Sequence, residues 1–444
     1  MIRSFGRTTR RQFLVTGVAA GAGVGMPFVR RALAATNWRK FDGTSIEVSM
    51  IKSPRGDIIQ KNLKAFEDLT GIEVGLEQVP EQQQRQKSVV EFSSGRPSFD
   101  VCHLSYHVQK RLFEKGRWLA DLKPFLDDPE LRDPNLDPED FSAAGKAYAT
   151  NEQGELRSLP ISVDYWIIYW NKDLFQKAGL EFPQTFDALI AAAEKLTDPA
   201  TGTYGFVARG MKNANLPVWA SFLLGYGVEP VGPGLQLNTT SEGALAATRM
   251  YQHLLTKTAP PGTIGFNWNE CQAAFLQGKA AMWLDGVGFA PPLEDPTKSR
   301  VVGKVGYAVM PKGPQAHASA TFGDGLGIAD ASQNKEAAFL FLQWALSKPL
   351  QAQLLQTGSG VPFRKSVLAD QTVRQGVKMP AAWVDSVIGS AEVSKFGLPV
   401  VVPVTEFRDI FGIALTNTLS GADPKDELQK ATDQFRPILE KSEA

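Results

Sequence analysis

Two of the chain's four histidines, His103 and His107, have a spacing that could hold a metal ion. They lie four residues apart, as in a helical metal pair, but no third ligand follows at a recognisable distance. His103 also falls at the end of a predicted strand, SFDVCHL. We therefore expect both side chains to be polar groups at a strand end, where α/β proteins form ligand crevices, and a metal carrier remains an alternative.

Motifs for enzymatic catalysis are scarce. The sequence has no Gly-x-Ser-x-Gly elbow and no phosphate loop, and the run from Gly323 to Gly327 precedes an extended segment rather than the helix that a dinucleotide fingerprint requires. No pair of carboxylates stands out for glycoside hydrolysis, although such a pair can come from anywhere in a chain. We expect no catalytic residue and no cofactor, and a secreted carbohydrate-active enzyme remains an alternative.

Tryptophans offer chemistry of another kind, because an indole ring is a rigid plate on which the C–H face of a sugar or polyol can stack. Five of the nine tryptophans fall between residues 166 and 283. Trp166 and Trp170 alternate with apolar residues in a predicted strand and are interpreted as packing. Trp219 and Trp268 begin predicted helices after polar loops, and such positions face crevices more often than cores.

The first 34 residues are typical of an export signal. Arg10 and Arg11 precede a weakly apolar run, as in twin-arginine signals, and the small residues near Ala34 suit cleavage. No cysteine follows that could carry a lipid anchor. Removing this segment takes away six arginines and leaves 41 basic and 47 acidic residues, a net charge of −6. Without a basic run, nucleic acid or an anionic membrane is not expected as partner, and a neutral small molecule fits better.

Strand and helix patterns alternate along the rest of the chain. SIEVSMI and IEVGLEQV have strand character and enclose a stretch with Ile59, Leu63 and Phe66 at helical spacing. From residue 159 the alternation of strand and helix patterns continues with the strand segment LPISVDYWIIYWNKDLF and a predicted helix that Thr185 caps. About 410 residues are too many for one ordinary core, so the pattern predicts two α/β lobes, each a mostly parallel sheet flanked by helices.

Several segments together resemble one family, the sugar-type extracellular solute-binding proteins of ABC importers. The segments are FDVCHLSYHVQKRLFEKGRWLADL, LPISVDYWIIYWNKDLFQKAGL, YGFVARG, FLQGKAAMWLD, GLGIADASQNKEAAFLFLQWALS and GVPFRKSVL. Each is modest alone, but they occur in the family's order over nearly the whole mature chain. The RG, W-x6-YG and NWNE elements are most similar to members that take up polyols and simple sugars.

The resemblance implies two lobes joined by extended crossings, which can absorb the dihedral changes of hinge closure. The lobes would comprise residues 35–160 plus 325–362 and residues 161–324 plus 363–444, behind a signal peptide at 1–34. The crossings would lie near Leu159 to Asp164, Phe322 to Ile328 and Val361 to Arg364. Ligand would be held between the lobes, and the closed form, a monomer in the periplasm, would dock on a membrane permease.

Candidate pocket residues follow where the resemblance and the chemistry agree. Carboxylates would accept hydroxyl hydrogens, Arg209 would bridge adjacent hydroxyl oxygens, and the aromatic rings would stack. The candidates are Asp164, Tyr165, Arg209, Trp219, Trp268, Asp285, Asp324, Arg364, His107 and Tyr106. The expected ligand is a neutral polyhydroxylated solute, with a phosphorylated or otherwise charged small solute as the alternative.

The export motif leads to a test of its own. Replacing both Arg10 and Arg11 by lysine should block export, because the twin-arginine route reads the arginine pair, while the purified mature protein should bind ligand unchanged. Fractionating cells that express each form measures the result. Equal export of the lysine form would show that another route carries this protein.

Overall fold

The computed structural model describes residues 36–151 and 153–444. The arginine pair at residues 10 and 11 and the predicted cleavage site near Ala34 lie outside the described residues. Within the described part, one eight-stranded sheet has the order β2-β1-β3-β7-β4-β5, with β6 beside β4 and β8 beside β7. No helix in this part is long and apolar enough to cross a membrane.

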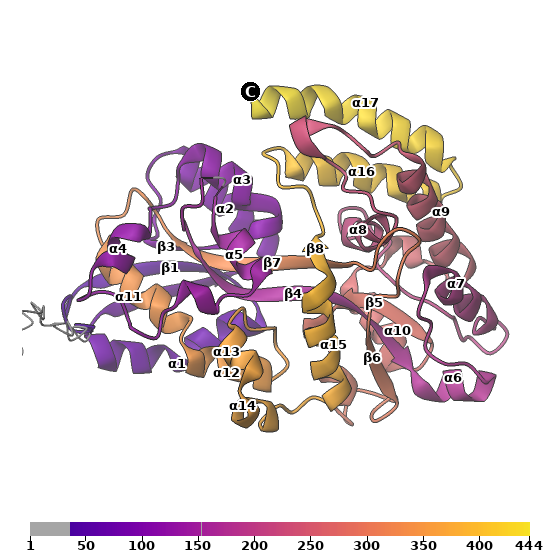
Figure 1. Ribbon diagram of the computed structural model, residues 1–444, viewed down its shortest axis with the longest axis horizontal. Helices are drawn as coiled ribbons and strands as arrows, with labels where there is room; N and C mark the ends of the chain where they lie inside the picture. Colours follow the sequence, from indigo (N-terminus) through magenta and orange to yellow (C-terminus); the bar gives the residue numbers. More distant parts are fainter. Residues whose placement is uncertain (1–35, 152) are drawn as a thin grey trace, which may run out of the picture. The chain divides into compact units, whose positions relative to one another are not determined.

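Three parallel strands form the end of the sheet that we call the first lobe, and a helix follows each of them (Figure 1). Strand β1 (Ser45–Ile51) pairs with β2 (Glu73–Val79) and β3 (Val101–Ser105). Ser53 caps α1 by accepting a hydrogen bond from the backbone of Gly56. The helices of the N-terminal part are α1 (Pro54–Thr70), α2 (Glu81–Ser93), α3 (Tyr106–Gly116), α4 (Lys123–Asp127) and α5 (Ala143–Ala149).

The other end of the sheet, which we call the second lobe, is built around the far half of β4. Strands β5 (Met282–Gly286) and β6 (Val305–Val309) both pair with it in antiparallel fashion. Thr185 caps α7, as predicted from the sequence. The helices of this lobe are α6 (Lys172–Ala178), α7 (Phe186–Lys195), α8 (Leu216–Gly225), α9 (Glu242–Lys257), α10 (Trp268–Leu276), α16 (Val404–Leu419) and α17 (Pro424–Glu443).

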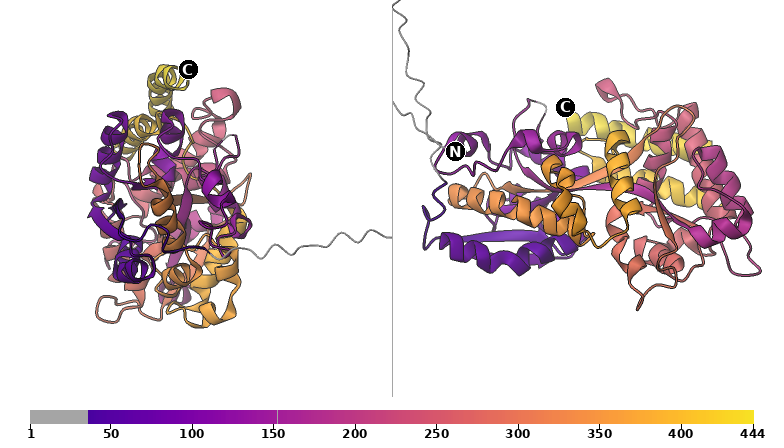
Figure 2. Two further views of the ribbon diagram at one scale, coloured as in Figure 1. Left: turned by 90° about the vertical axis from the view of Figure 1, so that its left-hand side faces the viewer. Right: turned by 60° about the horizontal axis from the view of Figure 1, so that its bottom comes forward.

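Two long strands, β4 (Leu159–Asn171) and β7 (Ser319–Ile328), run between the lobes (Figures 1 and 2). The first half of β4 pairs in antiparallel fashion with the central part of β7, and β7 also pairs with β3 in the first lobe. A third extended segment lies beside them, because Val163 and Val361 form a bridge. All three lie where the sequence predicts the crossings.

The remaining elements complete both lobes. They are α11 (Lys335–Ala345), α12 (Lys348–Gln356), α13 (Lys365–Ala369), α14 (Gln371–Gln375), α15 (Ala381–Val393), strand β8 (Ser394–Phe396) and short 3-10 turns at Pro138–Asp140, Pro233–Leu235, Thr263–Gly265, Val287–Phe289 and Pro291–Glu294. Helix α12 packs against α1 and also against α13 and α14, so the chain stays beside the first lobe for some residues after 363. The lobe boundaries remain a prediction.

The predicted α/β class is confirmed, with one correction to the strand directions. The sheet of the first lobe is parallel from β1 to β3, as expected, whereas β4 is antiparallel to β5, β6 and β7. The difference arises because β4 and β7 cross between the lobes in opposite directions, and β5 and β6 run in the direction of β7, so β4 opposes all three of these neighbours. Alternation of strands and helices in sequence does not reveal such a crossing.

Gly325 allows Tyr106 to pack on the crossing strands. A Cβ at Gly325 would overlap the Tyr106 ring, which stacks on Tyr148 at 5.1 Å and whose hydroxyl lies 2.8 Å from the Ser158 hydroxyl. Gly325→Ala should therefore lower the free energy of unfolding by about 1–3 kcal/mol in urea denaturation. Gly265→Ala is the control, because no neighbouring atom lies within 4 Å of its added Cβ. Equal stability of the two variants would contradict this packing.

Candidate functional site

A cavity of about 610 Å³ lies beside the crossing strands, and both lobes contribute to its wall. From the first lobe come the loop before α1, the first turn and a half of α2, and the junction of β3 and α3. From the second lobe come Arg209, Asn213, Trp268, Phe289 and Arg408. The crossing strands add Asp164, Trp166, Phe322 and Asp324. The volume is within the range of small-molecule sites.

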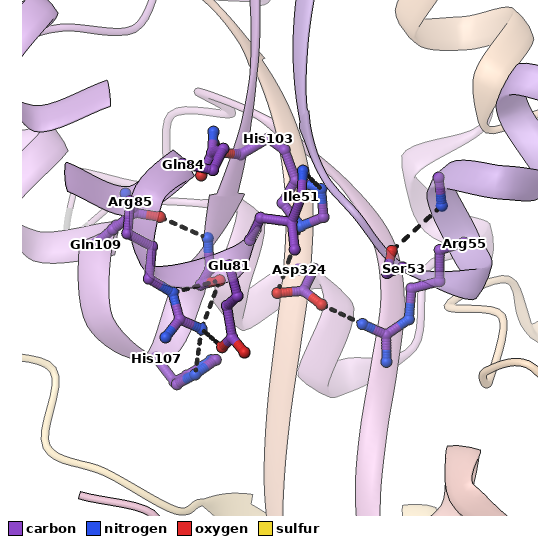
Figure 3. Close-up of polar contacts among 12 residues, drawn as sticks. Ile51, Ser53, Arg55, Glu81, Gln84, Arg85, His103, His107, Gln109 and Asp324 are labelled. Carbon is purple, nitrogen blue, oxygen red and sulfur yellow. Dashed lines mark hydrogen bonds and ion pairs between the residues drawn. The ribbon is translucent and has the colours of Figure 1, made fainter. Parts of the chain in front are cut away.

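Asp324 is a carboxylate that the first lobe holds in its ionised form (Figure 3). Arg55, at the start of α1, forms an ion pair with it, and His103 Nε2 lies 3.6 Å from its Oδ1. The Ile51 backbone N–H donates to His103 Nδ1 at 3.4 Å, so the ring proton sits on Nε2 and faces Asp324. Burial alone would raise the pKa of Asp324, but Arg55 and His103 hold it well below its usual range.

Arg85 and His107 form a second group on the first-lobe side (Figure 3). The Arg85 guanidinium pairs with Glu81 and donates two hydrogen bonds to the Ser105 hydroxyl, at 3.1 and 2.9 Å. His107 Nε2 lies 3.3 Å from Arg85 Nη2. Burial and the charge of Arg85 lower the pKa of His107 well below its usual value. His107 is therefore a neutral ring in the wall of the cavity.

Arg209 dominates the second-lobe side. Its guanidinium binds the fully buried Asp285 through two nitrogens, with Nε 2.9 Å from Oδ2. It lies between two rings, 4.9 Å from the centroid of Trp166 and 5.4 Å from that of Phe289. Burial opposes the charge, but Asp285 more than offsets this and raises the pKa of Arg209. The pair and the rings fix the orientation of the arginine before any ligand binds.

Trp268 presents an aromatic surface next to this arginine. It stacks on Phe289 with the ring centroids 5.0 Å apart and the planes inclined by 16°, and 39% of the residue is exposed. In the first turn of the helix that it begins, α10, Glu270 accepts a hydrogen bond from the Asn267 backbone N–H at 2.8 Å, which helps to fix that turn. An exposed indole on a rigid helix start is suited to stacking against a ligand.

Asp164 reaches the cavity from β4. Its Oδ1 is buried and has no hydrogen-bond partner within the described chain. Burial raises the pKa of Asp164 to about 6; Arg55 opposes this rise, and the neighbouring carboxylates Asp324 and Asp285 add to it. A buried acceptor without a partner is costly, so this oxygen is a candidate to accept a hydrogen bond from a ligand.

Five of the ten residues predicted as binding residues line the cavity: Asp164, Arg209, Trp268, Asp324 and His107. The other five are absent from the lining. Tyr165 is buried in the core because it points to the face of β4 opposite Asp164 and Trp166. Asp285 lies behind Arg209 and orients it, so its oxygens bind the guanidinium rather than a ligand.

The remaining three side chains have structural partners elsewhere. Trp219 is fully buried because all of α8 is buried, and its Nε1 donates to the Thr248 hydroxyl at 2.8 Å. Arg364 is also buried and donates to the backbone oxygens of Leu346 and Asn135. The Tyr106 hydroxyl bonds to Ser158, as described above. These three side chains are absent from the cavity lining, because polar neighbours in the sequence do not reveal a buried helix or strand.

Several lining residues were not predicted. Trp166, which the sequence predicts to be a packing residue, both packs and lines the cavity. Arg55, Arg85 and Arg408 also line it and are not among the predicted residues. Arg55 lies in the segment that follows the first buried strand, a position at which α/β proteins place ligand-binding groups. The sequence therefore contains a signal that favours Arg55 as a binding residue. Arg85 and Arg408 lie within helices, and nothing in their local sequence distinguishes them from surface arginines.

The two histidines do not form a metal site. His103 faces Asp324 and His107 faces Arg85, so their rings have different partners. Within residues 36–151 and 153–444, no group of three His, Cys, Asp or Glu side chains could hold a metal ion.

Asp164 generates a prediction about pH and stability. Its pKa is raised to about 6 in the folded state, so between about pH 4 and 6 the folded protein keeps a proton on Asp164 that the unfolded chain has lost. The contribution of Asp164 to the free energy of unfolding therefore falls as the pH rises through this window. Asp164→Asn mimics the protonated form. The difference in unfolding free energy, variant minus wild type, should be roughly 1–2 kcal/mol larger at pH 7.5 than at pH 4.

The measurement is urea denaturation of both proteins, without ligand, at the two pH values. Taking the difference between wild type and variant removes the pH dependence of all other groups. A difference in unfolding free energy that does not change with pH would contradict the buried environment assigned to Asp164.

Comparison with known proteins gives consistent matches. The chain is 26% identical over 421 residues to the erythritol/L-threitol-binding protein of Mycolicibacterium smegmatis, covering 88% of this chain and 85% of that protein. It is 27% identical over 276 residues to the mannitol-binding protein of Pseudomonas aeruginosa, covering 60% of each. A solute-binding protein of Agrobacterium radiobacter K84, crystallised with ribitol, superposes with a TM-score of 0.79 at 26% identity, covering 89% of this chain and 99% of that one.

Solved structures of lower identity show the same fold. A solute-binding protein of Agrobacterium vitis S4 with bound D-mannitol has a TM-score of 0.75 at 22% identity and covers 90% of this chain and 99% of that one. The family model for bacterial extracellular solute-binding proteins matches residues 52–352. The two-lobe fold predicted from the sequence is thereby confirmed, and the chain belongs to the family of bacterial extracellular solute-binding proteins.

Proposed function

We propose that this protein is the substrate-binding component of an ABC importer and captures a neutral sugar or polyol in the cavity beside the crossing strands. The observation that carries the proposal is the composition of the cavity wall. The same cavity is lined by paired charged side chains, by the Asp164 carboxylate with its unpartnered oxygen, and by the exposed ring of Trp268. Few ligand classes can use all three.

The paired charges favour hydroxyl groups. Arg55 is paired with Asp324, Arg85 with Glu81, and Arg209 with Asp285, so most of the charge in the wall is already neutralised. The first two pairs place both donors and acceptors in the wall, and Arg209 adds further donors. A hydroxyl both donates and accepts, and a row of hydroxyls on one carbon chain can bind to several such pairs at once. The C–H face of the same chain would stack on Trp268.

Relatives support the same ligand class. Two curated relatives are named for binding erythritol or L-threitol and mannitol, and two solved relatives contain ribitol and D-mannitol. Transport without chemical change agrees with the family, whose members are binding proteins. Delivery would require the lobes to close around the ligand by bending the crossings, and the closed form would dock on the permease. Export through the twin-arginine route to the periplasm belongs to the same proposal.

A screen of sugars and polyols by thermal unfolding tests the function. A ligand at about 1,000 times its dissociation constant adds about 4 kcal/mol to stability, which gives a clear rise in melting temperature. We expect at least one C4 to C6 polyol or simple sugar to produce it and to be recovered unchanged after incubation. If no member of a broad panel shifts the melting temperature, the ligand class is wrong; if the ligand is cleaved, the protein is an enzyme.

Two tryptophan variants show whether binding occurs in this cavity. Trp268→Ala removes the exposed plate and should weaken binding of the ligand found in the screen about tenfold in isothermal calorimetry. Trp219→Phe should leave the affinity nearly unchanged while lowering stability, because Trp219 is core. The reverse ranking of the two variants would place the ligand elsewhere.

A further inference from the structure

Arg408, on α16, differs from the other arginines in the cavity. Arg55, Arg85 and Arg209 each have a carboxylate partner, whereas no carboxylate oxygen of the described chain lies within 4.0 Å of the Arg408 guanidinium. Its Nη2 donates a hydrogen bond to the backbone oxygen of Asn213 at 3.0 Å. Its Nε is buried and has no partner among the described residues. Arg408 therefore brings to the cavity a positive charge without a direct ion pair.

Neighbouring groups add to this positive character. Burial and the charge of Arg85 lower the pKa of Arg408 to about 10, and Glu81, which is paired with Arg85, opposes this only in part. Arg408 in turn contributes to the lowered pKa of His107. Arg85 Nη2 can only donate, so His107 Nε2 is the acceptor of that contact and the ring proton sits on Nδ1. The ring packs against Phe322 of β7, and Gly323 and Asp324 both act on its pKa, so His107 is a neutral group beside that strand.

An anion would satisfy the unused donor of Arg408. A carboxylate offers two oxygens that match the planar fork of a guanidinium, and hydrogen bonds between ionised groups are about twice as strong as neutral ones. Among the charged neighbours, Arg55, Asp324, Asp285 and Arg209 influence the pKa of Asp164 most, whereas Arg85, Glu81 and Arg209 influence the pKa of Arg408 most. Asp164 would repel a carboxylate and accept from hydroxyls. The surroundings of Arg408 thus suit an anion, and those of Asp164 suit hydroxyls.

We propose that Arg408 forms an anion subsite, and that the cavity binds a polyhydroxylated carboxylate, an aldonate, more tightly than the polyol of the same chain length. The inference rests on the proposed function, because the hydroxyl chain of both ligands occupies the same cavity. The terminal hydroxymethyl group of a polyol and the carboxylate of an aldonate would take the same place, next to Arg408.

Calorimetry on matched ligand pairs tests the subsite. The pairs are erythritol with erythronate, ribitol with ribonate and mannitol with mannonate, each titrated into the mature protein. For the chain length that binds best, the aldonate should bind at least about tenfold tighter than the polyol, because a hydrogen bond to a charged group contributes about 1.5–3 kcal/mol. Raising the salt concentration from 20 to about 500 mM should weaken the aldonate and leave the polyol nearly unchanged.

Substitutions locate the effect. Arg408→Gln should remove the preference for the aldonate and change the affinity for the polyol by less than about threefold, because a neutral amide still bonds to a hydroxyl. Arg408→Lys should keep part of the preference, since it keeps the charge without the fork. Arg436→Gln, on the exposed side of α17, removes the same charge away from the cavity and should keep the full preference.

The outcomes separate this inference from the proposed function. Binding of a polyol with no tighter binding of its aldonate would overturn the anion subsite and leave the function intact. A preference for the aldonate that survives Arg408→Gln would also overturn it, because the anion would then be recognised elsewhere. Failure of both ligand series would contradict the proposed function itself. Should Arg408→Gln not fold, the wild-type ligand pairs and their salt dependence still decide the question.

Discussion

Antiparallel pairing between β4 and β7 is the interaction on which the site depends. Ser162 lies opposite Asp324 and Asp164 opposite Phe322, so one short stretch of ladder brings two carboxylates and an aromatic ring to the same cavity. Backbone hydrogen bonds fix this register, and a slip of one residue would turn each side chain to the other face. The same strands join the two lobes. A change in the angle between the lobes would therefore change the shape of the cavity.

Charge pairing explains how so many ionised groups can lie in a partly buried space. Desolvating a lone charge costs several kcal/mol, and a paired partner with additional hydrogen bonds offsets much of that cost. Arg55 with Asp324 and Arg209 with Asp285 are held in place by His103 and by two aromatic rings. Donors and acceptors are thus oriented before a ligand arrives, which reduces the entropy lost on binding. Asp164 and Arg408 are the exceptions, and both retain atoms that only a ligand or water can satisfy.

The fold could be predicted from the sequence because its signals are local and repeated. Strand and helix periods, the cap at Thr185 and the long strand from Leu159 all appear in the structure. The site could be predicted only in part. Asp164 and Tyr165 are adjacent in sequence, and only the direction of the strand pleat decides which of them meets the cavity. Trp219 follows polar residues as Trp268 does, but tertiary packing covers its whole helix. Whether Arg408 has an acidic partner is likewise decided by residues far away in the chain.

Small-molecule mass spectrometry on protein purified without unfolding tests the central claim most directly. The wild-type protein should release, on denaturation, a compound with several adjacent hydroxyls in a ratio near one per chain. Arg209→Gln, which removes the guanidinium that orients toward the cavity, should release much less of it. Release of a compound without adjacent hydroxyls, or equal retention by the variant, would contradict the account.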